Sequence, residues 1–236
     1  MKKILITQSN YIPWKGYFDA INKVDEFVIY DDVQYTRRDW RNRNQIKTKE
    51  GLRWMVIPVE VKGKYFQKIK ETKVSDKDWA KNHWAMLLQN YSKAPHFKEM
   101  KDVFEELYLN NSEEYLSVIN YNFITAINLL LGISTPVCFS NEFNLTEGKT
   151  ERLVDLCIQR GATDYYTGPA AKNYIDESFF QKESITVHYL DYNGYPEYPQ
   201  LFPPFEHGVT MLDLIFNTGA DAPKYMKSFF KEKIHS

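Results

Sequence analysis

The sequence predicts an α/β protein with a mostly parallel sheet that starts with a βαβ unit, and with a helical insertion in its middle third. Three observations support this class. Strand-type and helix-type patterns alternate over residues 1–30, helical patterns follow one another over about 76–132, and the alternation then returns. Because no low-complexity linker divides the chain, we expect a single domain over 1–236.

The βαβ unit lies at the N-terminus. Residues 2–7 form a short aliphatic run between polar residues, as in a buried strand. Apolar residues at helical spacing predict a helix over 14–24, and residues 26–30 form a second strand-type run. Two such strands connected through a helix are parallel, with a right-handed crossover. Runs at 53–59 and 66–74 predict two further strands.

Three consecutive helices form the predicted insertion. Apolar residues at helical spacing predict the first two over 79–91 and 97–108. Asn111, with Glu114 three residues later, resembles a capping box and predicts a third helix that ends at Gly132. Strands and helices then alternate, with strands predicted at 136–139, 163–167 and 185–190, and helices at 150–160 and 210–217.

The composition narrows the class of protein. The chain is 43% hydrophobic with a net charge of −1, which excludes a disordered chain and argues against nucleic acid as a partner. The apolar run at the N-terminus is too short for a signal peptide or a membrane span, so we expect a cytoplasmic protein without membrane insertion. Two cysteines are too few for a disulfide framework, and the scattered histidines predict no metal site. No motif identifies a cofactor, because the P-loop, dinucleotide-binding and hydrolase glycine patterns are absent.

The first candidate binding segment follows the first strand. Ligands of open α/β sheets bind at the carboxyl ends of strands. The loop there offers two amides, a tyrosine and a tryptophan, namely Gln8, Asn10, Tyr11 and Trp14. Alternatively, it is an ordinary polar loop whose tryptophan packs in the core.

The second candidate segment is basic and follows the second strand. Residues 36–49 carry six cationic side chains against one acidic residue, Asp39. Arginine forks suit phosphate or carboxylate groups, and a tryptophan can stack on a base or a sugar. The alternative is a solvated charged loop with internal salt bridges. The residues predicted here to bind substrate are Asp31, Gln34, Arg38, Trp40, Arg41, Asn42 and Arg43.

Two residues are candidates for proton transfer. Asp32 adjoins the basic segment, where a carboxylate can accept a proton, hold a metal or fix the arginines. His83 lies near the apolar edge of the first predicted helix of the insertion, where a lone histidine is alternatively a packing residue.

A third candidate segment follows the strand predicted at 163–167. Gly168 and Pro169 allow a close approach of the backbone to a ligand or simply make a turn, and Lys172 follows them. Further along, four tyrosines either line a sugar or base pocket or pack on the sheet: Tyr189, Tyr192, Tyr195 and Tyr198.

Several of these segments belong to a wider set of motifs. In order along the chain they are Q-S-N-Y-I-P-W-K-G-Y-F-D from Gln8, Y-D-D-V-Q-Y from Tyr30, W-R-N-R from Trp40, Trp79 to His83, Tyr91 to Pro95, K-T-E-R-L from Lys149, Y-T-G-P-A from Tyr166 and L-D-L-I-F-N from Leu212. Together these motifs span nearly the whole chain and resemble the WbqC-like protein family.

The resemblance implies a role in bacterial surface polysaccharides, because family members are commonly encoded in gene clusters for O-antigen lipopolysaccharide. We therefore expect a transferase that places an acyl or aminoacyl group on a nucleotide-linked amino sugar. Its partners would be that sugar, or another phosphate-bearing small molecule, and an acyl or aminoacyl donor. His83 or Asp32 would take the amine proton. The alternatives are an adenylyl or nucleotidyl transferase using the same phosphate site, or a non-catalytic binding protein of the glycan machinery.

One position departs from the family pattern. The family loop usually reads His-Gln-Pro-Asn-Tyr, whereas this chain carries Thr7 and Ser9 in place of the histidine and the proline. If that histidine is the family's base or phosphate donor, this protein lacks it and His83 becomes the better candidate. The loss of proline also leaves the turn less rigid.

Overall fold

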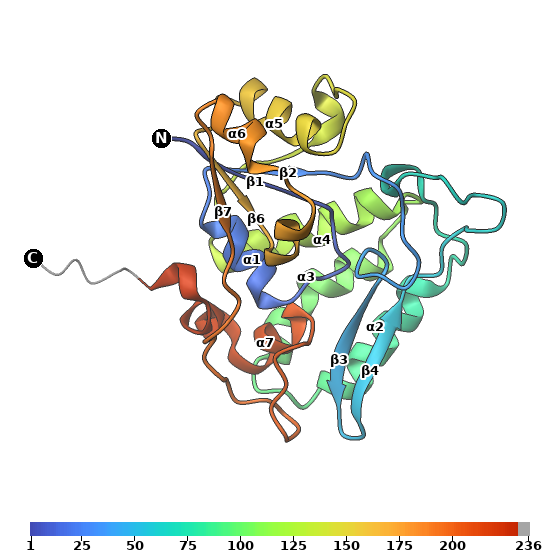
Figure 1. Ribbon diagram of the computed structural model, residues 1–236. Coiled ribbons are helices and arrows are strands. Elements are labelled where there is room, and N and C mark those ends of the chain that lie inside the picture. Colours follow the sequence, from blue (N-terminus) through green and yellow to red (C-terminus); the bar gives the residue numbers. More distant parts are fainter. Residues whose placement is uncertain (231–236) are drawn as a thin grey trace, which may run out of the picture.

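The computed structural model describes residues 1–230 and contains a five-stranded sheet (Figure 1). The strands lie in the order β5–β2–β1–β6–β7, and every pairing between neighbours is parallel. The predicted α/β class with a mostly parallel sheet is therefore confirmed. The strands are β1 (Lys3–Thr7), β2 (Glu26–Ile29), β5 (Val137–Phe139), β6 (Asp164–Thr167) and β7 (Thr186–Tyr189).

The connections run outwards from β1 in two directions. The chain passes from β1 to β2 and then to β5, and it returns to the other side of β1 to add β6 and β7. The connections therefore diverge between β1 and β6. In open parallel sheets a crevice forms at the carboxyl ends of the strands at such a point, and ligands bind there.

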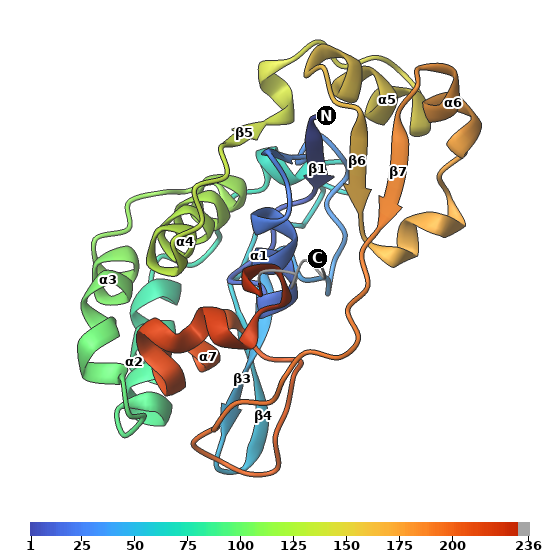
Figure 2. The ribbon, with the colours of Figure 1, turned by 90° about the vertical axis from the view of Figure 1, so that its left-hand side faces the viewer.

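Helices cover both faces of the sheet (Figures 1 and 2). Successive side chains of a strand point to opposite faces, so Leu5 packs with α1 whereas Ile4 and Ile6 pack with α5 and α6. Burial on both faces explains why the strands have continuous apolar sequences. These helices are α1 (Lys15–Asn22), α5 (Thr150–Gln159) and α6 (Glu177–Lys182), the last of which the sequence patterns did not predict.

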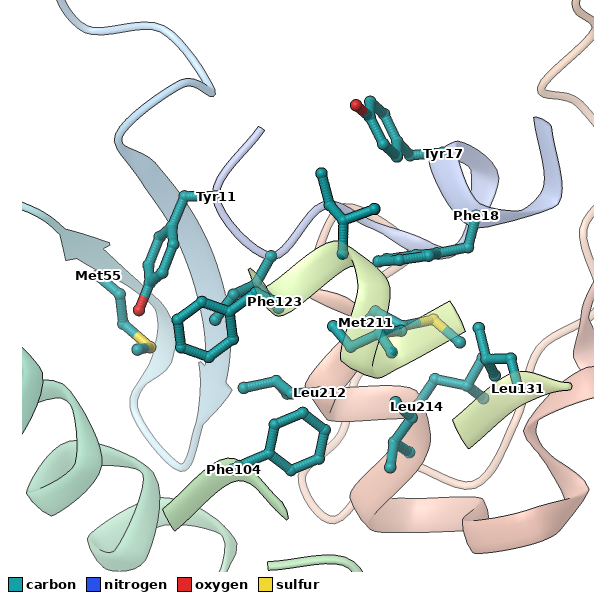
Figure 3. Close-up of a cluster of buried hydrophobic side chains, with 14 of the residues drawn as sticks. Tyr11, Tyr17, Phe18, Met55, Phe104, Phe123, Leu131, Met211, Leu212 and Leu214 are labelled. Atoms are coloured by element: carbon teal, nitrogen blue, oxygen red, sulfur yellow. The ribbon is translucent and has the colours of Figure 1, made fainter. Parts of the chain in front are cut away.

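A layer of helices packs beside α1. It consists of α2 (Trp79–Tyr91), α3 (Phe97–Leu109), α4 (Leu116–Leu131) and α7 (Met211–Thr218). Figure 3 shows Phe104, Phe123 and Leu212 from three of these helices in one buried cluster that also contains Tyr11 from the loop after β1. Burial of each such apolar side chain stabilises the fold by about 1.5–3 kcal/mol. The cluster therefore fixes the loop after β1 to the helical layer.

A two-stranded antiparallel hairpin follows β2. It consists of β3 (Arg43–Thr48) and β4 (Gly51–Val56). The strand predicted at 53–59 corresponds to β4, but β3 was not predicted, because its sequence is polar. Its burial arises from distant segments: the Lys47 amide donates to the Tyr91 hydroxyl at 3.0 Å, and the Lys47 ammonium donates to the Pro204 carbonyl at 2.6 Å.

The strand predicted at 66–74 is wrong. This segment contains a short 3-10 turn, Ile69–Glu71, and only isolated bridges to other segments. Its backbone amides bond to several different partners, including the carbonyls of Asp31, Val33 and Glu114, so no continuous ladder forms. The turn holds this segment against the end of β2.

The start predicted for the third helix of the insertion is also wrong. The side chain of Asn111 accepts a hydrogen bond from the Glu113 amide at 2.8 Å, which makes a local turn instead of a helix cap. The Leu116 amide donates to the Thr72 carbonyl at 2.9 Å, and α4 begins there. β4 ends three residues before its predicted end, and the other predicted helices and strands lie within two residues of their predicted bounds. Within residues 1–230, no helix has the length and apolar character that crossing a membrane requires.

Candidate functional site

The loop after β1, residues 8–13, is held by hydrogen bonds from segments that are distant in the sequence. The Asn44 side chain donates to the carbonyls of Tyr11 and Ile12 at 3.1 and 2.6 Å, and the Thr210 hydroxyl donates to the Ile12 carbonyl at 2.8 Å. Ile12 has a φ of 40°, which is unusual for a β-branched residue and persists only where surrounding contacts enforce it. The loop is therefore rigid although Ser9 replaces the proline of the family pattern.

Asp31 also holds the loop after β1 in place. It is 2% exposed and accepts hydrogen bonds from the amide and the hydroxyl of Ser9, at 2.9 and 2.7 Å, and from the hydroxyl of Ser117. Burial raises the pKa of Asp31, and the hydrogen bonds from Ser117 and Ser9 oppose that rise. Asp31 thus holds the loop in place, and its oxygens face protein donors. A proline at position 9 would lack the amide that Ser9 donates.

The larger of two candidate cavities lies where the sheet topology predicts a ligand site. It has a volume of about 530 Å³ and opens at the carboxyl ends of β1, β2 and β6. Thr7 and Gln8 line it from β1, Gln34 from the segment after β2, and Thr167 from β6. The position at which the family loop usually carries histidine is thus at the cavity, occupied by Thr7.

The start of α5 provides the positive charge of the larger cavity. Lys149 and Arg152 line the cavity together with the carboxylate of Glu147, and the N-terminus of α5 has no side-chain cap. Gly148 has a φ of +95°, which suits glycine in the turn that leads into the helix. Uncapped amides and the helix dipole favour an anion at such an end. Burial raises the pKa of Tyr30, and the positive charge of Arg152 opposes that rise.

Asp32 is the predicted proton acceptor that lies at the larger cavity. It is 4% exposed, and both of its oxygens have partners: Ser140 donates to Oδ2 at 2.8 Å, and the ammonium groups of Lys70 and Lys68 lie 2.5 and 3.7 Å from Oδ1. A carboxylate has about four lone-pair sites, so Asp32 keeps capacity for one more donor. Its geometry therefore allows a hydrogen bond from a bound ligand.

His83 lies elsewhere, which corrects its predicted role. It is 5% exposed; its Nδ1 bonds the Tyr11 hydroxyl at 2.8 Å, and its Nε2 bonds the Val56 carbonyl at 3.1 Å. Burial lowers the pKa of His83 to about 4. With both ring nitrogens used inside the helical layer, His83 and Tyr11 are packing residues, and neither lines the larger or the smaller cavity.

The smaller cavity lies on the other side of the loop after β1. It has a volume of about 310 Å³ and is lined by two indoles, two amide side chains, a proline, a histidine and a glycine: Trp14, Trp40, Asn10, Asn44, Pro13, His207 and Gly208. None of these side chains is a lysine, an arginine or a carboxylate. The two cavities therefore differ in charge.

The basic segment does not converge on one anion site. Arg37 and Arg43 donate to backbone carbonyls, and Arg43 also stacks on Trp54 at 4.2 Å. Arg38 is exposed with a φ of 59°, and its carbonyl accepts the bond from Arg43. Asn42 is buried and donates to the Ile57 carbonyl at 2.8 Å. These contacts match the alternative of a charged loop with internal contacts.

Arg41 is the arginine of this segment that turns inwards. Its guanidinium donates to the Ser9 carbonyl at 3.2 Å and to the Asn10 side chain. Burial raises the pKa of Tyr174, which lines the larger cavity, and the charge of Arg41 opposes that rise. Arg41 thus lies between the two cavities.

The third candidate segment borders the larger cavity. Thr167 and Tyr174, at its two ends, line the cavity. Lys172 is exposed and lies over the ring of Tyr189 at 4.9 Å. Gly168, which precedes Pro169, has no positive φ, so it makes the turn into a 3-10 helix without needing the freedom of glycine.

The regularly spaced tyrosines pack on the protein. Tyr195 and Tyr198 are buried, and they donate to Asp19 and Asp213 at 2.6 and 2.8 Å. Both rings also surround the ammonium of Lys15, whose pKa burial lowers to about 8. This segment therefore belongs to the packed alternative and does not form a sugar pocket.

Several residues of the cavities were not predicted. Lys149 and Arg152 had one signal, the Gly-Lys-Thr sequence directly before a predicted helix, but it lacks the first glycine of a P-loop. His207 had none, because its place depends on how a distant loop folds back. Within residues 1–230, no group of three or more histidine, cysteine, aspartate or glutamate side chains is arranged to hold a metal ion.

Comparison with known proteins places this architecture in a family. The model of the WbqC-like protein family matches residues 8–225. The chain belongs to the WbqC-like family. It is also 53% identical, over 227 residues, to the Mycobacterium tuberculosis protein named Uncharacterized protein Rv1507c, an alignment that covers 96% of this chain and 98% of that protein. No solved structure matches the chain.

Proposed function

We propose that this WbqC-like protein is a transferase of bacterial surface polysaccharide biosynthesis that binds a nucleotide-linked amino sugar through its diphosphate in the larger cavity. The observation that carries the proposal is the position of that cavity. It lies at the carboxyl ends of β1 and β6, where the connections diverge, and the uncapped start of α5 borders it.

The charge distribution supports a phosphate-bearing ligand. Lys149 supplies an exposed ammonium, and Arg152 supplies a guanidinium, a group that binds phosphate oxygens in pairs. The Nε of Arg152 donates to the Thr146 carbonyl at 2.7 Å, and its Nη2 lies 4.0 Å from Glu147. Both cations come from the start of α5, and two carboxylates, Asp32 and Glu147, also line the cavity. A small anion fits that pattern better than a nucleic acid does.

The uncharged groups of the cavity support a sugar beside the phosphates. The side chains of Gln8, Gln34 and Thr167 offer donors and acceptors to hydroxyl groups. Asp32 lies among them with its oxygens held by Ser140 and Lys70. This arrangement orients one carboxylate beside a polar ligand.

The proposed reaction is transfer of an acyl or aminoacyl group to the sugar amine. The amine nitrogen attacks the acyl carbonyl and forms an amide bond, and the bond from the carbonyl to the donor's leaving group breaks. Asp32 accepts the proton that the amine loses, and general base catalysis of this kind contributes about 10²–10⁴-fold in rate. His83 takes no part, because it is buried in the helical layer.

A binding experiment tests the phosphate site directly. In the double variant Lys149→Ala/Arg152→Ala, we expect the affinity for a uridine-diphosphate-linked amino sugar to fall at least about 100-fold by calorimetry, because bonds to charged groups contribute about 1.5–3 kcal/mol each and the variant removes two such groups. Lys182→Ala is the matched control, since it removes an exposed cation from α6 and should leave the affinity unchanged.

Three outcomes would contradict the proposal. Unchanged affinity in the double variant would place the diphosphate elsewhere. Release of pyrophosphate from ATP and magnesium, without amide formation, would establish nucleotidyl transfer instead. Tight binding with no turnover against a set of acyl and aminoacyl donors would favour a non-catalytic binding protein.

A further inference from the structure

The smaller cavity carries a second inference. It is separated from the larger cavity by the loop after β1, and Asn10 and Trp14 project into it from that loop. Trp40 lies at its edge and is 44% exposed, which is high for an indole. An exposed indole beside a cavity has a face free for a ligand.

The lining indicates a neutral ring. No lysine, arginine or carboxylate lines this cavity, so a phosphate or a carboxylate would find no partner charge there. The indoles of Trp14 and Trp40 offer flat apolar surfaces from two different segments. Nucleobases stack on aromatic side chains, each such stack contributing about 1–3 kcal/mol. A volume of about 310 Å³ accommodates a ring of that size.

Polar groups at the edge of the cavity suit the edge of a base. Nδ1 of His207 is buried and has no hydrogen-bond partner among the described residues. Burial and the nearby charge of Lys15 lower the pKa of His207, which favours the neutral imidazole. A neutral imidazole has one donor and one acceptor nitrogen, and the amide of Asn10 has a donor nitrogen and an acceptor oxygen that also bonds Arg41. Base edges present both kinds of group.

The loop connects the two cavities over a short distance. Gln8 lines the larger cavity and Asn10 the smaller one, and their Cα atoms are at most about 7 Å apart, because only Ser9 separates them. Arg41 lies between the cavities, bonded to Ser9 and Asn10. One nucleotide can therefore reach both.

We propose that the smaller cavity binds the nucleobase of the nucleotide-linked substrate, stacked against Trp40 and Trp14, with Asn10 and His207 at the base edge. This inference rests on the proposed function, because the phosphates of the same molecule occupy the larger cavity. It assigns the base and the phosphates to opposite sides of the loop after β1.

The test compares ligands with and without a base. The probes are pyrophosphate, the nucleoside diphosphates UDP, ADP and GDP, and the free nucleosides, with binding followed by calorimetry and by tryptophan fluorescence. We expect at least one nucleoside diphosphate to bind more tightly than pyrophosphate. Trp40→Ala should lower the affinity for that nucleoside diphosphate about 5–100-fold and leave the affinity for pyrophosphate unchanged.

Trp54→Phe is the control. Trp54 packs against Trp40 with ring centroids 5.5 Å apart but does not line the cavity, so its replacement should change neither affinity. Trp40 is half exposed, so Trp40→Ala should fold, which circular dichroism verifies.

The inference is overturned if Trp40→Ala binds the nucleoside diphosphate as tightly as the unaltered protein does. It is also overturned if methyl glucoside quenches the fluorescence and free nucleosides do not, since that assigns the cavity to a sugar. Absence of pyrophosphate binding would contradict the proposed function alone, because free nucleosides test the smaller cavity independently.

Discussion

The two cavities on either side of the loop after β1 differ in how the chain builds them. The larger cavity is made by the ends of parallel strands and the start of α5, and it carries Lys149, Arg152 and Asp32. The smaller cavity is made by loops and by β3, and its lining is uncharged and aromatic. Sheet topology thus provides the polar site, whereas tertiary packing of remote segments provides the apolar one.

This difference explains why one short loop matters to both sites. Gln8 and Asn10 lie on opposite sides of Ser9, whose amide and hydroxyl are fixed by Asp31. Because the loop is rigid, Gln8 can contact a ligand in the larger cavity while Asn10 contacts one in the smaller cavity. A substitution at either residue should therefore affect one cavity and leave the other unchanged.

The largest effect is expected at Asp32. Asp32→Asn removes the proposed proton acceptor, so we expect amide formation to fall at least about 100-fold in turnover. Binding of the nucleotide-linked sugar should be unchanged or tighter, because the substitution removes a negative charge from the larger cavity. Steady-state kinetics alongside calorimetry checks this. A parallel loss of turnover and affinity would mean that Asp32 only maintains the shape of the cavity.

His83 is expected to affect stability and not the site. Its pKa is about 4 in the folded protein against an ordinary value of 6.5, so unfolding takes up a proton in this range. The stability that neutral His83 contributes is complete above pH 6.5 and is lost as the pH falls towards 4, by about 3 kcal/mol. The free energy of unfolding in urea should depend less steeply on pH in the His83→Gln variant than in the unaltered protein. The same slope in both would contradict the burial account.

A substitution at Asn44 is expected to weaken binding in both cavities, because Asn44 holds the loop that lies between them. Asn44→Ala removes the side-chain donor of the Tyr11 carbonyl and leaves the Ile12 carbonyl with the Thr210 hydroxyl alone, at a cost of about 1–3 kcal/mol in stability. We expect weaker binding of both pyrophosphate and nucleosides. Asn42→Ala removes a buried amide that bonds Ile57 in the hairpin, so it should lower stability but leave both affinities intact. Equal effects on binding from the two variants would break the comparison.

The smallest and most selective effect is expected from a substitution at Thr7. Thr7→His introduces at the larger cavity a side chain that gains a positive charge near pH 6.5. Pyrophosphate affinity should then rise a few-fold between pH 8 and pH 6 relative to the unaltered protein, while nucleoside binding stays constant. An increase confined to nucleosides would mean that position 7 communicates with the smaller cavity.

Three residues of the larger cavity were predictable because local patterns locate the parallel strands, whose carboxyl ends share one edge of the sheet. Gln8, Asp32 and Gln34 follow strands, so their side chains meet at one edge. The charged residues at the start of α5, Lys149 and Arg152, were harder to predict. Gly148 and Lys149 precede a predicted helix, but that signal is common.

The basic segment and His83 show where sequence patterns fail. Charge along the chain does not reveal that Arg37 and Arg43 contact backbone carbonyls, because those acceptors lie on other segments or in a local turn. Helical spacing placed His83 near an apolar edge without indicating that Tyr11 and Val56 would use both ring nitrogens. Partners remote in sequence decide both outcomes.

The most direct test of the phosphate site is a crystal structure of the protein with a uridine-diphosphate-linked amino sugar. The diphosphate should lie at the start of α5, with Lys149 and Arg152 on its oxygens and Asp32 facing the sugar. Density for the diphosphate against Arg38 and Arg43 of the basic segment, with the larger cavity free of ligand, would contradict the account.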